Sequence, residues 1–362
     1  MNKRTGKISA GFQSVLIIAL CLTSCEKESD EPSNLPEVGA SPVAWAVGYE
    51  DNTNHATVLF SADSGSTWIR QGAGSNALQG MDASNLYAID SKDVWVVGSN
   101  RTIARTTDGG NSWEKVNSPP VGADVNFNCI SIFNETDIWI SGGGTSSGIV
   151  CKSVDKGDSW TIMDTSLFQG FLMQGILAIN SQVVYTVGSN SGASWNGRVA
   201  RTLDGGNTWD TISLDNNKWV DWIDVTASDE NHVTVYGGQC HYAYTTDGGE
   251  SWTTDSIPIG GVEDINHLIM LDNLNWWGAC DMDNIRRTTD GGLTWSAQQS
   301  AGPGNMHLMG IDAYNDQLAL ITGQSAGWPQ GGKILQTKDG GNTWICRHTA
   351  DIYLVKVAFA SR

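Results

Sequence analysis

The sequence predicts an all-β fold, and three observations lead to this prediction. A segment of the form Ser/Thr-x-Asp-x-Gly-x-Ser/Thr-Trp occurs seven times along the 362 residues. Between the copies lie short runs of β-branched and aromatic residues, separated by Gly, Asn, Asp and Ser, which are strand and turn signals. No amphipathic helical pattern of useful length competes with these runs. A segment that recurs at a nearly fixed period is the sequence signature of a repeat architecture.

The repeated segment is predicted to form a tight turn between two strands. Its seven aspartates are 43 to 49 residues apart, and they are Asp63, Asp108, Asp155, Asp204, Asp247, Asp290 and Asp339. The Asp side chain can cap backbone N–H groups of its own turn, and the Gly can adopt a positive φ. The Trp that ends each copy is expected to begin the next strand and to fill space between neighbouring sheets.

Each repeat period contains four strand-like pieces, named A to D here in chain order. In the second unit they are residues 86–89, 94–98, 102–106 and 113–116. Four strands per period, repeated radially, predict a seven-bladed β-propeller over residues 42–362. The first unit begins with a strand of type B and lacks strand A, whereas the chain ends in an unassigned strand. We therefore expect the C-terminal strand to pair into the first blade, which closes the ring and removes exposed edges.

The repeated segment resembles the Asp-box, also called the BNR repeat. This repeat occurs in sialidases, sortilin-like receptors, two-propeller xyloglucanases and photosystem II assembly factors. Residues 200–209, Ala-Arg-Thr-Leu-Asp-Gly-Gly-Asn-Thr-Trp, and the number of blades are most similar to the assembly-factor family. The resemblance implies that the seven aspartates are structural and not catalytic. A shared fold by itself implies only an assembly or binding scaffold, because unrelated functions use the same fold.

The N-terminal segment is expected to target and tether the domain. Residues 1–24 combine a basic start with a short apolar run, which is the pattern of a signal peptide. Leu-Thr-Ser-Cys, ending at Cys25, resembles a bacterial lipobox, so Cys25 is the expected lipid attachment site. Residues 25–41 are acidic and contain Pro, which predicts a flexible tether. Their acidic start resembles the export signal of Bacteroidetes lipoproteins. This implies a bacterial outer-membrane lipoprotein, surface-exposed or otherwise periplasmic.

The charge balance restricts the class of partner. The chain has 21 Lys and Arg against 39 Asp and Glu, a net charge of −18. Removal of residues 1–24 would leave 18 basic residues and a net charge of −21. Such a charge argues against nucleic acid or anionic lipid as a partner and favours a neutral ligand or a basic protein. We expect a monomer that contacts the membrane only through its lipid.

The cysteines argue against a disulfide framework. Besides Cys21 and Cys25 the chain has five, and they are Cys129, Cys151, Cys240, Cys280 and Cys346. An odd count without Cys-x-x-Cys spacing excludes a disulfide framework and the standard zinc patterns. Cys129 and Cys346 are expected to be small core residues. Cys240 and Cys280 end equivalent strands of adjacent blades, so a disulfide between them is left open.

Loop lengths indicate where a ligand would bind. In a propeller the C–D turns lie on one face, here called the box face, while the B–C and D–A loops share the other, here called the loop face. From the strand-B Gly to the box Asp, blades one to seven have 15, 10, 13, 16, 10, 12 and 16 residues, so blades one, four and seven have extended loops. The candidate ligand-binding residues are Tyr49, Asn52, His55, Trp195, Asn196, Trp219, His241, Trp328 and Gln330. Aromatic rings beside Asn, Gln and a carboxylate can stack on sugars or hold a peptide.

The function favoured by these observations is non-catalytic binding of a glycan or an envelope protein through the loop face. The alternative is a glycoside hydrolase or polysaccharide lyase that acts on an extracellular polysaccharide, and a purely structural role in an envelope complex is a third possibility. A glycosidase needs two carboxylates about 5–10 Å apart across a cleft. Asp51, Asp264 and Asp281 are the candidates, but the sequence marks no pair among them. No cofactor and no metal are expected.

Overall fold

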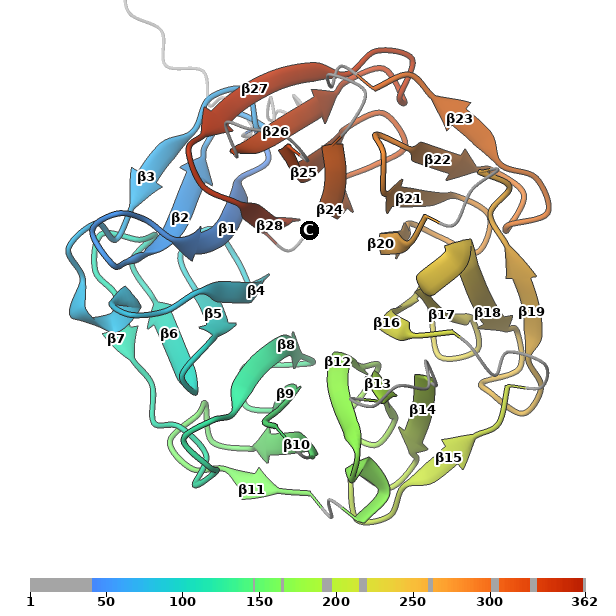
Figure 1. The fold of residues 1–362 in the computed structure, drawn as a ribbon, viewed down its shortest axis with the longest axis horizontal. Coiled ribbons are helices and arrows are strands. Elements are labelled where there is room, and N and C mark those ends of the chain that lie inside the picture. The colour runs from blue at the N-terminus through green and yellow to red at the C-terminus, as the bar shows by residue number, and fades with distance from the viewer. Residues whose placement is uncertain are drawn as a thin grey trace, which may run out of the picture. The chain divides into compact units, whose positions relative to one another are not determined.

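Seven antiparallel sheets of four strands each surround a central axis in the described part of the chain (Figure 1). The computed structural model describes residues 41–145, 147–163, 166–190, 197–214, 220–259, 263–300, 306–325 and 331–360. In every blade the strands follow each other from the centre to the rim in the order A, B, C and D. The prediction of an all-β, seven-bladed β-propeller is therefore confirmed.

The strands are short, and those of the blade rims are the shortest. From the centre outward, blade one consists of β28 (Leu354–Phe359), β1 (Ala44–Glu50), β2 (Ala56–Ser61) and β3 (Ile69–Gln71), and blade two of β4 (Ala83–Ala88), β5 (Val94–Gly98), β6 (Thr102–Thr106) and β7 (Glu114–Lys115). Blade three consists of β8 (Asn126–Ile132), β9 (Ile138–Gly143), β10 (Gly148–Ser153) and β11 (Thr161–Ile162), and blade four of β12 (Phe171–Ala178), β13 (Val184–Asn190), β14 (Gly197–Thr202) and β15 (Asp210–Ile212). Blade five consists of β16 (Trp222–Ala227), β17 (Val233–Gly237), β18 (His241–Thr245) and β19 (Thr253–Ser256), and blade six of β20 (Ile265–Met270), β21 (Trp276–Cys280), β22 (Ile285–Thr288) and β23 (Ser296–Gln298). Blade seven consists of β24 (Met306–Ala313), β25 (Ala319–Ser325), β26 (Gly332–Thr337) and β27 (Ile345–Ala350). Three short 3-10 turns lie between described strands, and they are η1 (Asn76–Leu78), η2 (Ser166–Phe168) and η3 (Gly238–Cys240).

The C-terminal strand closes the ring as the sequence predicts. Strand β28 pairs antiparallel with β1, with Val357 opposite Ala46, and so becomes strand A of the first blade (Figure 1). Both edges of β1 are thereby paired, because its other neighbour is β2. The first blade is consequently built from the two ends of the described chain.

Each repeated turn is held by its own aspartate. In blade four, Asp204 accepts hydrogen bonds from the Thr208 backbone N–H at 2.8 Å, the Thr208 hydroxyl at 2.6 Å and the Thr202 hydroxyl at 2.8 Å. These hydrogen bonds, of which the two from Thr208 have the largest effect, lower the pKa of Asp204 to about 2. Gly206 has a φ of +94°, and its N–H donates to the Thr202 hydroxyl at 2.9 Å. The carboxylate is thus committed to shaping the turn.

Aromatic rings join neighbouring blades. The second residue of strand B is aromatic in five blades, and these residues are Trp45, Trp95, Trp139, Tyr185 and Trp277. Four of them meet the box Trp of the next blade edge to face, with centroids 5.8–6.2 Å apart, in the pairs Trp45–Trp113, Trp139–Trp209, Tyr185–Trp252 and Trp277–Trp344. An edge-to-face pair adds about 0.5–1.5 kcal/mol beyond the burial of its surface. The box Trp lies just before strand D rather than within it, and its ring packs against the neighbouring blade.

Basic side chains of strand C reinforce these contacts. The Lys152 Nζ atom lies 4.8 Å from the ring centroid of Trp139 and donates to the Gly205 carbonyl oxygen of the next box at 3.2 Å. The Arg287 guanidinium lies 4.6 Å from the ring centroid of Trp277 and donates to the carbonyl oxygen of Gly340, the first glycine of the box in blade seven. Cations over indole rings and charged donors on carbonyl oxygens are both stabilising. These cations therefore serve the contacts between blades.

A β-bulge interrupts strand A at the same place in every blade. The residue opposite the bulge on strand B is Gly48, Gly98, Gly142, Gly188, Gly237, Cys280 or Gly323, in blades one to seven. A Cβ atom on Gly237 would lie 1.8 Å from the Asp221 carbonyl oxygen, so the close approach of the two backbones requires glycine there. The predicted loop length of blade six, counted from Gly278, was wrong, because Cys280 holds the position that glycine has in the other blades. The B–C loop of blade six is consequently as short as those of blades two and five.

Replacement of Trp139 by Ala tests the contact between blades. The Trp139 side chain is fully buried, so Trp139→Ala should lower the free energy of unfolding by about 3–5 kcal/mol through lost packing and a new cavity. Leu293→Ala is the control, because Leu293 is 78% exposed and the change should stay within about 0.5 kcal/mol. Urea unfolding measures both values. A loss below about 1 kcal/mol for Trp139→Ala would contradict the role given to the ring.

Candidate functional site

A surface cavity of about 400 Å³ lies where the first and last blades meet. The B–C loop of blade one supplies Asp51 and Asn52, and β3 supplies Arg70. Strand β27 supplies His348, and the segment between β27 and β28 supplies Asp351. We call this the seam cavity. Ring closure therefore brings the predicted ligand-binding residue Asn52 next to residues from the last part of the chain.

Asp51 organises the blade-one side of the seam cavity. Its Oδ1 atom accepts hydrogen bonds from the Thr53 N–H at 2.8 Å, the Thr53 hydroxyl at 2.6 Å and the His55 N–H at 3.3 Å, and its Oδ2 atom lies 2.8 Å from Arg70 Nη2. Burial raises the pKa of Asp51, but the hydrogen bonds and the arginine together outweigh burial and bring it to about 2. Asp51 is therefore ionised at neutral pH and has no proton to give as a general acid.

The other predicted residues of this region take different positions. Tyr49 is 41% exposed, and its ring meets Tyr353 edge to face with centroids 5.7 Å apart. The His55 ring is half-buried, with Nδ1 2.8 Å from the Thr53 carbonyl oxygen. Tyr49 and His55 thus lie on blade one, which forms one side of the seam cavity, but neither lines the cavity. His241 begins β18 in blade five, and its buried Nδ1 atom has no hydrogen-bond partner among the described residues.

Several predicted residues fall outside the described residues, so their surroundings do not enter the geometry of the site. They are the expected lipid attachment site Cys25 and the candidate ligand-binding residues Trp195, Asn196, Trp219, Trp328 and Gln330.

Two of the alternative catalytic residues lie in neighbouring loops, and the third does not. The Asp264 N–H lies 3.5 Å from Asp281 Oδ2, in neighbouring loops of blades five and six. Asp281 Oδ1 accepts from Asn266 Nδ2 at 2.8 Å and lies 2.6 Å from His307 Nδ1, while Asp264 Oδ1 accepts from the Gln239 N–H at 2.9 Å. Asp51, by contrast, lies on blade one. The described residues contain no group of three or more His, Cys, Asp or Glu side chains placed to hold a metal ion.

The cysteines of residues 41–360 are all free thiols in the described ranges. Cys129 is buried as expected, and Cys151 is buried too. Cys240 and Cys280, for which a disulfide was left open, are both buried and unpaired. Cys346 was expected in the core but is exposed. The physical reason is that β27 is the rim strand of its blade, so a strand-like sequence there does not imply burial.

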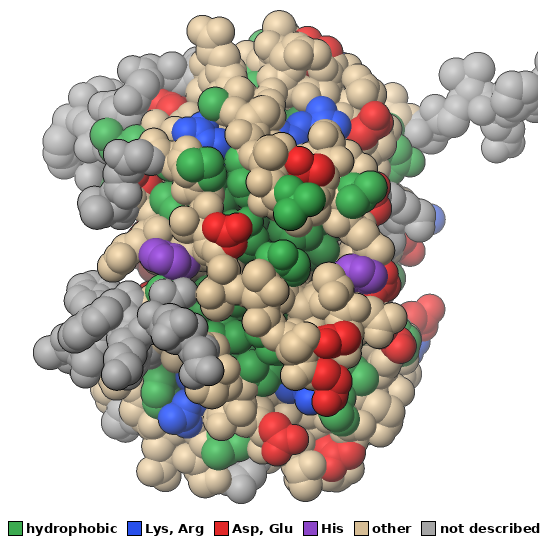
Figure 2. Space-filling view, turned by 90° about the vertical axis from the view of Figure 1, so that its right-hand side faces the viewer, with side chains coloured by type: hydrophobic (Ala, Val, Ile, Leu, Met, Phe, Trp, Pro, Cys, Tyr) green, Lys and Arg blue, Asp and Glu red, His purple; other side chains and the backbone are tan. Residues whose placement is uncertain are grey.

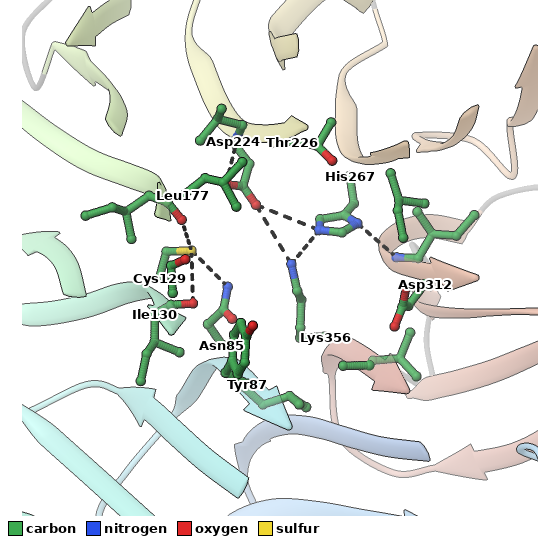
Figure 3. Close-up of a pocket in the computed structure, with 18 of the residues that line it drawn as sticks. Asn85, Tyr87, Cys129, Ile130, Leu177, Asp224, Thr226, His267, Asp312 and Lys356 are labelled. Atoms are coloured by element: carbon green, nitrogen blue, oxygen red, sulfur yellow. Dashed lines mark hydrogen bonds and ion pairs between the residues drawn. The ribbon is translucent and has the colours of Figure 1, made fainter. Parts of the chain in front are cut away.

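A second candidate site, which the sequence analysis missed, lies in the central channel. A cavity of about 330 Å³ there is lined by the innermost strands of all seven blades (Figure 3). The residue after the strand-A bulge holds the equivalent position in every blade, and these residues are Asn85, Cys129, Gly175, Asp224, His267, Gly310 and Lys356. The five that have side chains all line this cavity, which we call the channel cavity.

Three of these side chains meet across the channel (Figure 3). The Lys356 Nζ atom of β28 lies next to the His267 Nε2 atom of β20, within hydrogen-bonding distance. The Asp224 Oδ2 atom of β16 lies 3.8 Å from both Lys356 Nζ and His267 Nε2. The Ile311 N–H donates to His267 Nδ1 at 3.3 Å, which helps to orient the ring. Gly175 makes room for the carboxylate, because a Cβ atom there would lie 2.3 Å from Asp224 Oδ1.

Burial governs the protonation of the channel residues. Burial raises the pKa of Asp224, and the charge of Lys356 offsets only part of that rise. Burial, followed by the charge of Lys356, lowers the pKa of His267 well below its usual 6.5, so this imidazole is neutral at pH 7. Burial also raises the pKa of Cys129 to about 12, which keeps its thiol protonated and unreactive at neutral pH.

The channel residues carry one signal that could have revealed them. Each is followed directly by an aliphatic core residue, as in Asp224-Val225, His267-Leu268 and Lys356-Val357. Only an alignment of the seven repeats on this apolar position shows that a polar residue precedes it in several blades. The contact among them also requires the closed ring.

The pKa of His267 predicts a pH dependence of stability. Its folded-state pKa lies below the unfolded value of about 6.5, so the unfolded chain binds more protons as the pH falls. The free energy of unfolding of the protein should therefore decrease between pH 7 and pH 5, and His267→Gln should flatten this slope. Leu293→Ala, at an exposed residue that does not titrate, is the control and should keep this slope. Urea unfolding at a series of pH values decides, and an equal slope in His267→Gln would contradict the assignment.

Comparisons with known proteins agree with the fold. Residues 81–211 match the model of the family described as photosynthesis system II assembly factor YCF48. The chain is also 32% identical over 130 residues to the photosystem II assembly lipoprotein Ycf48 of Synechococcus sp. (strain CC9902). That alignment covers 35% of each of the two chains, so this chain matches about a third of the length of that relative.

Two solved structures are similar over most of the chain. YCF48 from Cyanidioschyzon merolae has a TM-score of 0.59 at 15% identity, covering 84% of this chain and 97% of that one. YCF48 bound to a D1 peptide has a TM-score of 0.57 at 18% identity, covering 74% and 81%. At these identities the similarity shows the fold alone. The described part of the chain has no helix that is both long and apolar enough to span a membrane. The chain is therefore a seven-bladed propeller whose residues 81–211 are similar in sequence to the Ycf48 assembly factors.

Proposed function

We propose that this chain is a non-catalytic scaffold that binds a segment of a partner protein at the seam cavity on the loop face. The observation that carries the proposal is the junction of Asp51 and Asn52 from the first blade with His348 and Asp351 from the last. The sequence similarity to an assembly lipoprotein and the shared fold with a propeller that binds a D1 peptide support it. We extend the proposal to a lipid anchor at Cys25 and a place at the bacterial outer membrane.

The seam cavity offers the groups that a peptide requires. Asn52 and Asp351 are exposed, so a partner can reach a carboxamide and a carboxylate there. His348 is half-buried, and its burial lowers its pKa, which leaves a neutral imidazole as a further hydrogen-bonding group. Leu59 and Ile352 add apolar surface to the wall of the cavity. Apolar surface with a few placed polar groups suits recognition of a short chain segment.

The charge of the surface indicates the chemistry of the partner. The chain has a net charge of −18, and several basic side chains, such as Lys152 and Arg287, are occupied by contacts between blades. Figure 2 shows acidic side chains scattered over one side of the molecule, with Lys and Arg in fewer places. An acidic surface attracts positive charge and repels negative charge over roughly 10 Å at 0.1 M salt. The bound segment is therefore neutral or basic.

Blocking the seam cavity tests the proposal. Partner proteins are first captured by a photo-crosslinking amino acid at position 52 of the full chain in its native membrane, with position 293 on the box face as the control. Synthetic peptides that together cover the sequence of a captured protein are then titrated against the full chain. Asn52→Trp should weaken peptide binding at least tenfold because the indole fills the cavity, whereas Leu293→Trp should leave it unchanged.

Three results would overturn this function. One is equal crosslinking from positions 52 and 293, and another is unchanged peptide affinity in a folded Asn52→Trp variant. The third is retention of a polysaccharide, with or without release of reducing ends, when no protein segment binds. That last result would favour the glycan-binding or glycosidase alternative.

The lipid anchor has a separate test. Cys25→Ala removes the thiol that the lipid would modify, so the variant should move from the membrane fraction to the soluble fraction. Cell fractionation followed by immunoblotting measures the shift, and Cys346→Ala serves as the control because that exposed thiol lies on β27. A Cys25→Ala variant that stays with the membrane fraction would refute the anchor without affecting the proposed binding surface.

A further inference from the structure

We propose that the channel cavity binds a small neutral hydroxylated molecule, such as a polyol or a monosaccharide. Asp224, His267 and Lys356 would be its polar contacts. The cavity is formed by strand A of all seven blades and is separate from the seam cavity in the residues that line it. This second site is therefore independent of the proposed protein-binding function.

The spacing of the polar atoms points to a bridging oxygen. Asp224 Oδ2 is 3.8 Å from Lys356 Nζ and 3.8 Å from His267 Nε2. A direct hydrogen bond between such atoms has a length of about 2.7–3.2 Å, so these groups are near each other without being bonded. An oxygen between them would have to accept from Lys356 and donate to Asp224. A hydroxyl group does both, whereas a carboxylate only accepts and an ammonium group only donates.

A further polar side chain of the channel has a weak partner. Asn85 is 6% exposed, and its Nδ2 atom contacts the Cys129 sulfur at 3.4 Å. Sulfur is a poor acceptor, so this buried carboxamide has hydrogen-bonding capacity to spare. Buried polar groups are costly unless their hydrogen bonds are made. A second hydroxyl group on the same molecule could supply such a bond.

The charges of the channel cavity favour a neutral occupant. Asp224 and Lys356 carry opposite charges and offset each other. The Asp312 carboxylate, also in the lining, accepts hydrogen bonds from the Phe359 N–H at 2.7 Å and the Ala313 N–H at 2.8 Å. At the Asp224–Lys356 pair a charged ligand would meet an opposing charge beside the attractive one, and its desolvation would be poorly offset. A neutral polyol loses no such hydration of charge.

The size and walls of the channel cavity suit the same class. Its volume of about 330 Å³ exceeds the roughly 30 Å³ that one water occupies in the liquid and lies at the lower end of typical ligand sites. Leu177 and Ile269 line it as well, so the C–H groups of a sugar or polyol ring would meet apolar surface.

Calorimetric titration of the purified full chain tests the proposal. The neutral probes are glycerol, myo-inositol, glucose and galactose, and the charged probes are acetate and ethylamine. At least one neutral probe should bind, and Asp224→Asn and Lys356→Met should each weaken its binding at least tenfold. Leu293→Ala on the box face is the control and should bind as the unmodified protein does.

Three outcomes of these titrations would contradict a site for a neutral hydroxylated molecule. Failure of all neutral probes, tighter binding of a charged probe, or full affinity in both folded variants would each overturn the proposal. Lys356 lies on the strand that closes the ring, so Lys356→Met could lower the melting temperature. In that case Asp224→Asn and His267→Gln carry the test, because both keep a polar side chain of similar size. Loss of peptide binding in Asn52→Trp has no bearing on this site.

Discussion

The contact between an aromatic ring of one blade and the box turn of the next is the interaction on which this structure depends. A four-stranded blade cannot bury both of its faces alone, so its stability comes from its neighbours. Trp139 shows how this works, because it meets Trp209, Lys152 and the backbone of Gly206 at once. A Cβ atom at Gly206 would lie 2.8 Å from the indole. The repeated Asp, Gly and Trp are therefore parts of one joint, and the blade number follows from how many joints the chain encodes.

Because the box turns form this contact, the two faces of the propeller have different roles. The box face carries turns whose aspartates are saturated by their own hydroxyls and backbone, as Asp204 shows. The loop face is not bound by the repeat, so its loops can differ in length and composition without loss of the blade contacts. Binding residues are commonly found on such loops, held by a rigid frame. The seam cavity lies next to the B–C loop of blade one and beside the strand that closes the ring.

The strand-A bulge likewise lets the residues at the channel differ in type from blade to blade. The residue after the bulge, where it has a side chain, lines the channel cavity in each blade, and the residue that follows, such as Val225 or Leu268, is a buried aliphatic residue. Packing therefore constrains the aliphatic position and leaves the channel position open. Asp224 and His267 are costly to place there, since burial shifts the pKa of each away from its charged form. Residues kept at such a cost are often functional.

The sequence by itself determined the features that arise within one repeat. The box residues, the strand runs and the orphan strand at the C-terminus specify seven blades, their strand order and the closure of β28 onto β1. These features rest on local turn chemistry and on alternation along a strand, which can be read from neighbouring letters. Boundaries such as the start of β7 after Trp113 were off by a residue, because they depend on backbone pairing with the neighbouring strand.

The tertiary structure alone decided what depends on several blades at once. Cys346 is exposed because its strand is at the rim, and Cys280 replaces a glycine at the bulge. The meeting of Asn52 with His348 requires a closed ring, and so does the meeting of Lys356 with Asp224 and His267. Such contacts join residues that are far apart in the chain, and no local preference encodes which of them face each other. The sequence therefore predicted the frame, whereas the two cavities emerged only when the last strand joined the first blade.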